Sequence, residues 1–226
     1  MLVAPLDPLA ASIFSLITIA SMLLSFVMLG SRWLKDYMYA FGIQSWLIAL
    51  LSALVGYYGH YPELYLIAVL TVLFRGLLLP YLVLRILRRL HVGRELHLVL
   101  QPSTSLIVGA ICVIFSLVLA FRISTAIGYP EKIVVLALTV MFTMKLVGFL
   151  ILSIRHEAVS HILGLMLLEN GIFLGSQILI PGMPMLIELV VLFDLLVAVA
   201  CFGVLVRYLL ARVGSTSSLE LNRLIG

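Results

Sequence analysis

The sequence predicts an all-α, polytopic membrane protein with seven transmembrane helices. Of the 226 residues, 64% are hydrophobic and only 11% are charged, and the mean hydropathy is +1.26. A soluble domain has about 45–50% apolar and about 25% charged residues. Apolar runs recur along the chain, and each is long enough to cross a bilayer as a helix of about 20 residues. We therefore expect residues 1–226 to form a single transmembrane domain.

Seven apolar runs are the predicted spans, and most begin at a proline, which costs no helical hydrogen bond in a first turn. The spans cover residues 8–29, 38–58, 63–86, 103–121, 131–153, 158–179 and 184–209. The prolines at their heads are Pro8, Pro62, Pro102, Pro130 and Pro184. Pro80 differs because it lies inside the third span. It should free the Gly76 carbonyl and kink that helix.

The distribution of Lys and Arg predicts the orientation, because basic residues concentrate in cytoplasmic loops. Ten of them fall on one side of the predicted spans: Arg32, Lys35, Arg85, Arg88, Arg89, Arg94, Arg155, Arg207, Arg212 and Arg223. Only Arg122 and Lys132 fall on the other side. We expect the N-terminus outside, the C-terminus in the cytoplasm, and the protein in the cytoplasmic (inner) cell membrane.

The order of the spans divides the chain into three parts. Residues 1–130 hold an N-terminal part of four helices, and residues 131–210 hold a part of three helices. Residues 211–226 are a short polar tail that the orientation places in the cytoplasm. No linker separates these parts, so we expect them to pack as one unit.

Ionisable residues near the middle of four predicted spans are the main clue to function. They are Arg75, Lys145, Glu169 and Asp194. At about 1.5 Å per residue, all four fall within roughly two turns of the bilayer midplane. A charge there costs at least about 2.5–3.5 kcal/mol on insertion scales, so such residues usually face a partner or a water-filled path. Glu188, in the seventh span, adds a third carboxylate to this set.

These residues have the chemistry that a proton path requires. Buried carboxylates and lysines exchange protons when burial brings their affinities toward neutrality, whereas arginine stays charged and acts on its neighbours. Glu169, Asp194, Glu188 and Lys145 are the predicted titrating members. His161, toward the cytoplasmic end, could pass protons to Glu169 from about 12 Å away. Alternatively, the charges form ion pairs that only hold helices together, and His161 is an interfacial residue without a role.

Other motifs in the sequence indicate packing rather than catalysis. Gly171 and Gly175 form a GxxxG pattern that lets another helix approach closely, and Asn170 could hydrogen-bond across the same interface. Cys112 and Cys201 lie alone in apolar runs. We find no metal-ligand spacing, phosphate-binding loop, nucleophile motif or nucleic-acid patch, and we predict no catalytic, cofactor-binding or metal residue in this chain.

Three segments resemble the component E family of hydrogenase-4, membrane subunits of formate-hydrogenlyase-type group 4 hydrogenases. They are HILGLMLLENGIFL in the sixth span, VLVRYLLARVGSTSSLELNRL after it, and FRGLLLPYL around Arg75 and Pro80. The last three spans of that family resemble the small K-type subunit of respiratory complex I, which carries proposed proton-relay glutamates. Asp194 matches the third-helix position, whereas Glu169 lies about one turn beyond the second-helix position.

The resemblance implies a non-catalytic subunit of a hetero-oligomeric membrane complex. Its expected partners are antiporter-like subunits and a hydrogenase-type peripheral module, with the nickel-iron and iron-sulfur centres in those partners and no nucleic acid. The expected function is a share of a proton path in an energy-converting, ion-translocating hydrogenase or related redox complex. Two alternatives stay open: a stand-alone proton-coupled secondary transporter, which an odd number of spans without a repeat disfavours, and a purely structural membrane-arm subunit.

Overall fold

The computed structural model describes residues 8–89, 101–155 and 158–180, together with single residues between 193 and 208. Apart from isolated bridge residues at Trp33 and Arg155, all regular structure in these ranges is helical. The helices are α1 (Pro8–Gly30), α2 (Leu34–Gly59), α3 (Glu63–Thr71), the π-helix η1 (Val72–Leu78), α4 (Leu79–Arg89), α5 (Pro102–Ala126), α6 (Lys132–Ile154) and α7 (Ala158–Leu179). The all-α prediction is therefore confirmed for the described part of the chain.

Among the described residues, six helical segments are long and apolar enough to cross a membrane, with α3, η1 and α4 together forming one of them. They correspond to the first six predicted spans, and the chain is a multi-pass membrane protein. The predicted seventh span, 184–209, lies largely outside the described residues. Two predicted limits were too narrow: α2 begins four residues earlier than expected, at Leu34, and α5 continues to Ala126, which places Arg122 inside the helix rather than in a loop.

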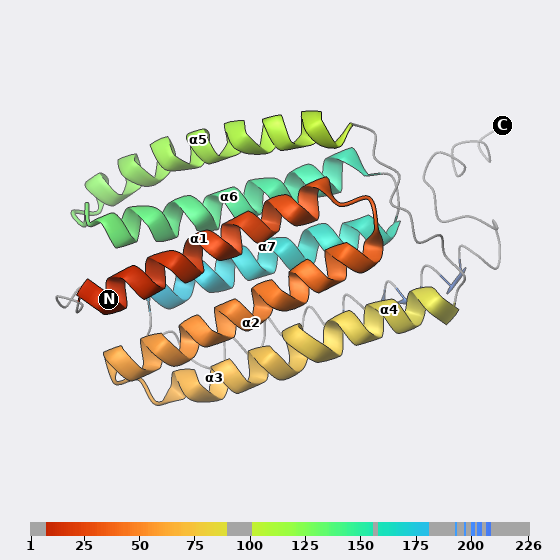
Figure 1. Cartoon of the computed structure of the whole chain (residues 1–226), viewed down its shortest axis with the longest axis horizontal. Coiled ribbons are helices and arrows are strands. Elements are labelled where there is room, and N and C mark those ends of the chain that lie inside the picture. The colour runs from red at the N-terminus through yellow and green to blue at the C-terminus, as the bar shows by residue number, and fades with distance from the viewer. Residues whose placement is uncertain are drawn as a thin grey trace.

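The helices form an elongated bundle with α7 in its interior. Figure 1 shows α5 at one edge and the α3–η1–α4 segment at the other, with α6, α1, α7 and α2 between them. Helix α7 packs on α6 and α2, and α1 packs on α2, α5 and α6. Only 17% of the most apolar stretch of α5 is buried, against 72% of that of α7. The helices of the two predicted parts, 1–130 and 131–210, thus pack against one another.

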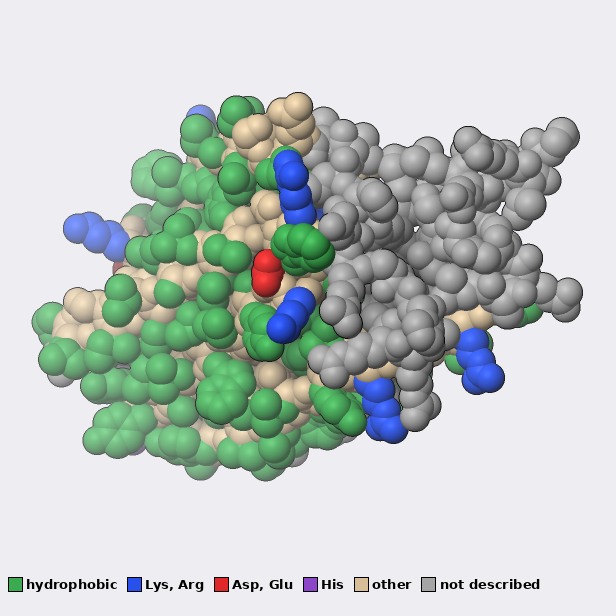
Figure 2. Space-filling view, turned by 45° about the vertical axis from the view of Figure 1, so that its right-hand side comes forward, with side chains coloured by type: hydrophobic (Ala, Val, Ile, Leu, Met, Phe, Trp, Pro, Cys, Tyr) green, Lys and Arg blue, Asp and Glu red, His purple; other side chains and the backbone are tan. Residues whose placement is uncertain are grey.

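The outer surface of the bundle is apolar, as contact with lipid requires. Large exposed side chains include Leu16 on α1, Trp46 on α2 and Phe115 on α5. The described part of the face in Figure 2 is mostly hydrophobic, with a few separate basic side chains and an acidic one on it. A soluble monomer rarely exposes such a continuous apolar surface.

Glycine contacts bring α6 and α7 together. A Cβ atom on Gly148 would lie 2.9 Å from the Gly164 carbonyl oxygen, and one on Gly164 would lie 2.9 Å from that of Gly148. Gly171 and Gly175 lie against Met144 and Met141 of α6 in the same way. The predicted close packing at GxxxG is confirmed, and the same interface is also close at Gly148 and Gly164.

The irregularity predicted at Pro80 takes the form of the π-helix η1. Proline has no N–H and cannot bond to a carbonyl in the preceding turn. The chain widens just before it, so that the Leu79 N–H bonds to the Phe74 carbonyl five residues earlier. Such π-helical turns are rare and are frequently found at functional sites.

Candidate functional site: a buried arginine and its amide partners

Arg75 lies in η1 and is completely buried. Its Nη1 donates a hydrogen bond of 3.1 Å to Oδ1 of Asn170 on α7. Its guanidinium carbon lies 4.7 Å from the centre of the Phe173 ring, also on α7, which adds a cation–π contact. Arginine stays charged in proteins, so a fixed positive charge sits inside the bundle.

Asn170 connects this arginine to two more helices. Its Nδ2 donates to Oε1 of Gln44 at 3.0 Å and to Oγ of Ser45 at 3.3 Å. Gln44 in turn donates from Nε2 to the Ser21 carbonyl of α1 at 2.8 Å. All of these side chains are buried. We call Arg75, Asn170, Gln44, Ser45 and Ser21 the arginine cluster; it joins four segments of the bundle through one continuous chain of hydrogen bonds.

Two glycines allow η1 to approach α2 next to this cluster. A Cβ on Gly76 would lie 2.8 Å from the Trp46 ring, closer than real atoms approach. A Cβ on Gly42 would lie 3.6 Å from the Gly76 carbonyl oxygen. Glycine at position 76 thus lets the backbone of η1 lie against α2, so that the long side chain of Arg75 reaches α7.

The other predicted path residues take different places. Glu169 precedes Asn170 on α7 and is partly exposed, and Lys145 is partly exposed on α6. The Lys145 backbone nitrogen lies 3.6 Å from where a Cβ of Gly171 would be, so Lys145 is at the level of Asn170 and Glu169. His161 is exposed, two turns before Glu169. Glu188 and Asp194 lie outside the described residues.

Sequence reasoning singled out Asn170 but missed Gln44, Ser45 and Ser21, because it searched the other spans mainly for ionisable residues. Gln44 is the one amide in the middle of α2, and it is completely buried. A glutamine amid apolar residues in a membrane span needs a hydrogen-bond partner nearly as much as a charge does. That signal could have identified Gln44 as a partner of Asn170.

A second buried arginine, Arg155, lies just after α6 and is 1% exposed. Its Nη2 lies 3.2, 3.3 and 3.0 Å from the carbonyl oxygens of Met28, Leu29 and Ser31 at the C-terminal end of α1. Its guanidinium carbon is 5.9 Å from the Tyr37 ring. The sequence placed this basic residue in the loop after the fifth span, without a partner. The side chain is buried instead, because the last carbonyls of a helix lack helical partners and attract a cation.

The described residues offer no grouping of three His, Cys, Asp or Glu side chains that could hold a metal ion. The arginine cluster consists of a cation, two amides and hydroxyl or carbonyl groups. Such a set can orient water and stabilise negative charge nearby.

Sequence comparison with known proteins finds a distant relative of this chain. It is 27% identical over 178 residues to the uncharacterized protein Rv0085 of Mycobacterium tuberculosis, a match that covers 76% of this chain and 79% of that protein. No protein-family profile and no solved structure matches the chain.

Proposed function

We propose that this chain is a non-catalytic integral membrane subunit of an energy-converting, ion-translocating hydrogenase or a related redox complex, and that it contributes to a proton path. The observation that carries the proposal is Arg75, a buried cation in a π-helical turn whose hydrogen-bond partner, Asn170, directly follows Glu169. Burying such a charge inside a membrane bundle is costly, and residues of this kind mark ion and proton paths. The resemblance of three segments to the component E family supports the same class.

In this proposal Arg75 is the fixed charge, and carboxylates carry the proton. Its field favours negative charge on a neighbouring carboxylate. Glu169 and Asp194 are the central carriers, Lys145 and Glu188 link them to adjacent helices, and His161 serves the cytoplasmic end. Redox centres of nickel, iron and sulfur belong to the partner subunits.

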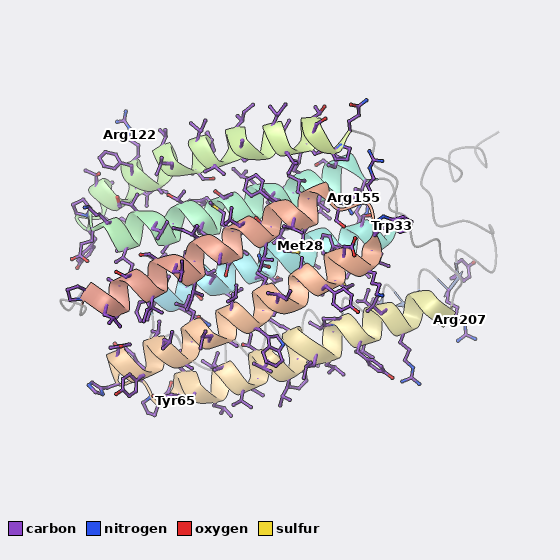
Figure 3. All side chains as sticks on the ribbon, in the orientation of Figure 1. Met28, Trp33, Tyr65, Arg122, Arg155 and Arg207 are labelled. Carbon is purple, nitrogen blue, oxygen red and sulfur yellow. The ribbon has the colours of Figure 1, made fainter. Side chains whose placement is uncertain are left out.

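The proposed orientation has the N-terminus outside and the C-terminus in the cytoplasm, in the inner membrane. Arg32, Lys35, Arg85 and Arg155 lie at the end of the bundle that holds the α1–α2 connection, and Arg122 and Lys132 lie at the opposite end. Figure 3 shows Arg155 and Trp33 at the first end and Arg122 at the other. This asymmetry supports the assignment of the first end to the cytoplasm.

The test is proton translocation by the whole complex in inverted membrane vesicles, measured together with electron transfer. Glu169→Gln and Asp194→Asn should leave the complex assembled but abolish translocation. Glu63→Gln is the matched control, because Glu63 is an exposed acid in the first turn of α3. Normal translocation in both central variants would rule out the relay.

A purely structural role is the second candidate, and the hydrogen bonds of Asn170 favour it. This single side chain bonds to both η1 and α2. If the role is structural, Asn170→Leu should reduce the amount of assembled complex, while each assembled complex translocates protons normally. In a relay, assembled complexes with this substitution translocate poorly.

A further inference from the structure

A second pair of buried polar side chains lies between α2 and α7, one heptad beyond the arginine cluster. Gln177 of α7 donates from Nε2 to Oγ of Ser52 on α2. Gln177 follows Asn170 by seven residues, and Ser52 follows Ser45 by seven, so the two levels are about 10.5 Å apart along both helices. We call Gln44, Ser45, Ser52, Asn170 and Gln177 the α2–α7 seam. All five side chains are buried.

The second level has unused hydrogen-bonding capacity. Oε1 of Gln177 is buried and accepts no hydrogen bond from the described residues, although Gln177 is only 3% exposed. Buried amide oxygens are nearly always paired, and water is the usual partner where protein groups do not supply one. If packing alone were needed here, leucine would fill the same space.

The seam leads toward a surface pocket. Gly56 follows Ser52 by one helical turn, about 6 Å along α2. It lines a pocket of about 460 Å³ together with Tyr57, Tyr58, His60, Pro62 and Tyr65. The pocket lies at the α2–α3 turn, at the end of the bundle opposite to Arg155; Figure 3 labels Tyr65 at that end.

We infer that the α2–α7 seam is a hydrated polar path that connects the arginine cluster with the pocket at the α2–α3 turn. Each amide of the seam has both a donor and an acceptor group, so it can orient water without being ionised. Water between the two levels would carry the proton, and the side chains would position it. The inference rests on the proposed function only for the identity of the ion; hydration of the seam stands on the contacts alone.

Cysteine accessibility in the full chain tests this inference. Cys112 and Cys201 are first replaced by serine, and Ser52→Cys, a nearly isosteric change, and Gln177→Cys are made in that background. Membranes are treated with Ag⁺, a small thiol-reactive cation that enters only hydrated regions, and unreacted thiols are counted after denaturation with a fluorescent maleimide. Ala137→Cys is the control, since Ala137 is small, completely buried and also near this end of the bundle.

We expect both seam cysteines to react at least about tenfold faster than the control, because a cation crosses apolar packing at a high free-energy cost. Reaction of Ser52→Cys and Gln177→Cys at the rate of Ala137→Cys would overturn the inference. The result is independent of proton coupling. If the seam cysteines do not react but Glu169→Gln loses translocation, the hydrated seam is overturned and the proposed function stands. If the cysteines react but Glu169→Gln translocates normally, the hydrated seam stands and the proposed proton relay is overturned.

Discussion

The two buried arginines of this protein show two different ways to keep a guanidinium inside a helical bundle. Arg155 lies at a helix end and donates to main-chain carbonyls of Met28, Leu29 and Ser31. Those carbonyls need a partner whatever the protein does, so the local geometry accounts for the residue. Arg75 lies within a span and bonds to the side chain of Asn170.

The difference separates a stabilising cation from a candidate functional one. In the middle of a span most backbone carbonyls are already engaged in the helix, so a buried cation there requires partners supplied by other side chains. The chain supplies Asn170 from α7, which in turn bonds to Gln44 of α2, and it widens its own helix at η1. A buried arginine thus indicates function only when helix capping does not explain it.

The largest effect should follow the loss of Arg75. Arg75→Met keeps much of the side-chain volume but removes the charge, and we expect proton translocation per electron to fall by at least about tenfold, since a buried charge changes the proton affinity of a neighbouring carboxylate by that factor or more. Arg85→Met is the control, because Arg85 is exposed on α4. Translocation assays on vesicles with equal amounts of complex measure both. An equal loss of translocation in Arg75→Met and Arg85→Met would contradict a specific role for the buried charge.

Arg155→Ala should instead lower stability. Three carbonyls would lose a charged donor in a buried place, and we expect the free energy of unfolding to fall by about 2–4 kcal/mol. Unfolding of the purified chain in mixed detergent micelles measures this. Arg155→Lys should recover part of the loss, because an ammonium group can bond to some of the same carbonyls. A translocation defect per assembled complex as large as that of Arg75→Met would show that Arg155 is more than a cap.

Gly148→Ala tests the packing that supports both arginines. The added methyl group would lie 2.9 Å from the Gly164 carbonyl oxygen, and such overpacking costs about 1–3 kcal/mol. At Gly30 the same change would meet the Leu106 side chain at 3.6 Å, an ordinary contact, so Gly30→Ala is the control. The same unfolding assay should separate the two variants. Equal stabilities would mean that α6 and α7 separate easily.

The smallest effect concerns the bond between Asn170 and Gln44. A double-mutant cycle with Asn170→Leu and Gln44→Leu should give a coupling energy of about 0.6–1.7 kcal/mol, the range found for polar contacts between membrane helices. Pairing Asn170→Leu with Ser25→Ala on α1, which bonds within its own helix, should give a coupling energy near zero. A negligible coupling in the first cycle would weaken the description of the arginine cluster as a connected network.

Hydropathy and proline positions predicted the six described spans, because membrane helices depend on local apolar length more than on tertiary contacts. GxxxG likewise predicted the close approach at Gly171 and Gly175. The sequence did not predict a π-helix. Pro80 indicated an irregular helix, but the position at which the hydrogen bonds change from four-residue to five-residue spacing depends on how η1 packs against Trp46 of α2.

The buried position of Arg155 was not predictable either. A basic residue between two spans is usually interpreted as a topology determinant. Only the fold shows that Arg155 contacts the end of α1, more than 120 residues earlier in the chain. Similarly, Gln44 and Asn170 are 126 residues apart. Sequence patterns find residues that need partners, whereas tertiary packing decides which partners they meet.

The π-helix also has a consequence for chain length. Each of its hydrogen-bonded rings closes over five residues instead of four, as the bond from Leu79 to Phe74 shows. The stretch therefore behaves like a one-residue insertion between α3 and α4. Removing a single residue from 72–78 should restore a regular helix that still crosses the membrane. The Arg75 side chain would then point in another direction. The shortened span would still insert into the membrane, but it would no longer place the guanidinium against α7.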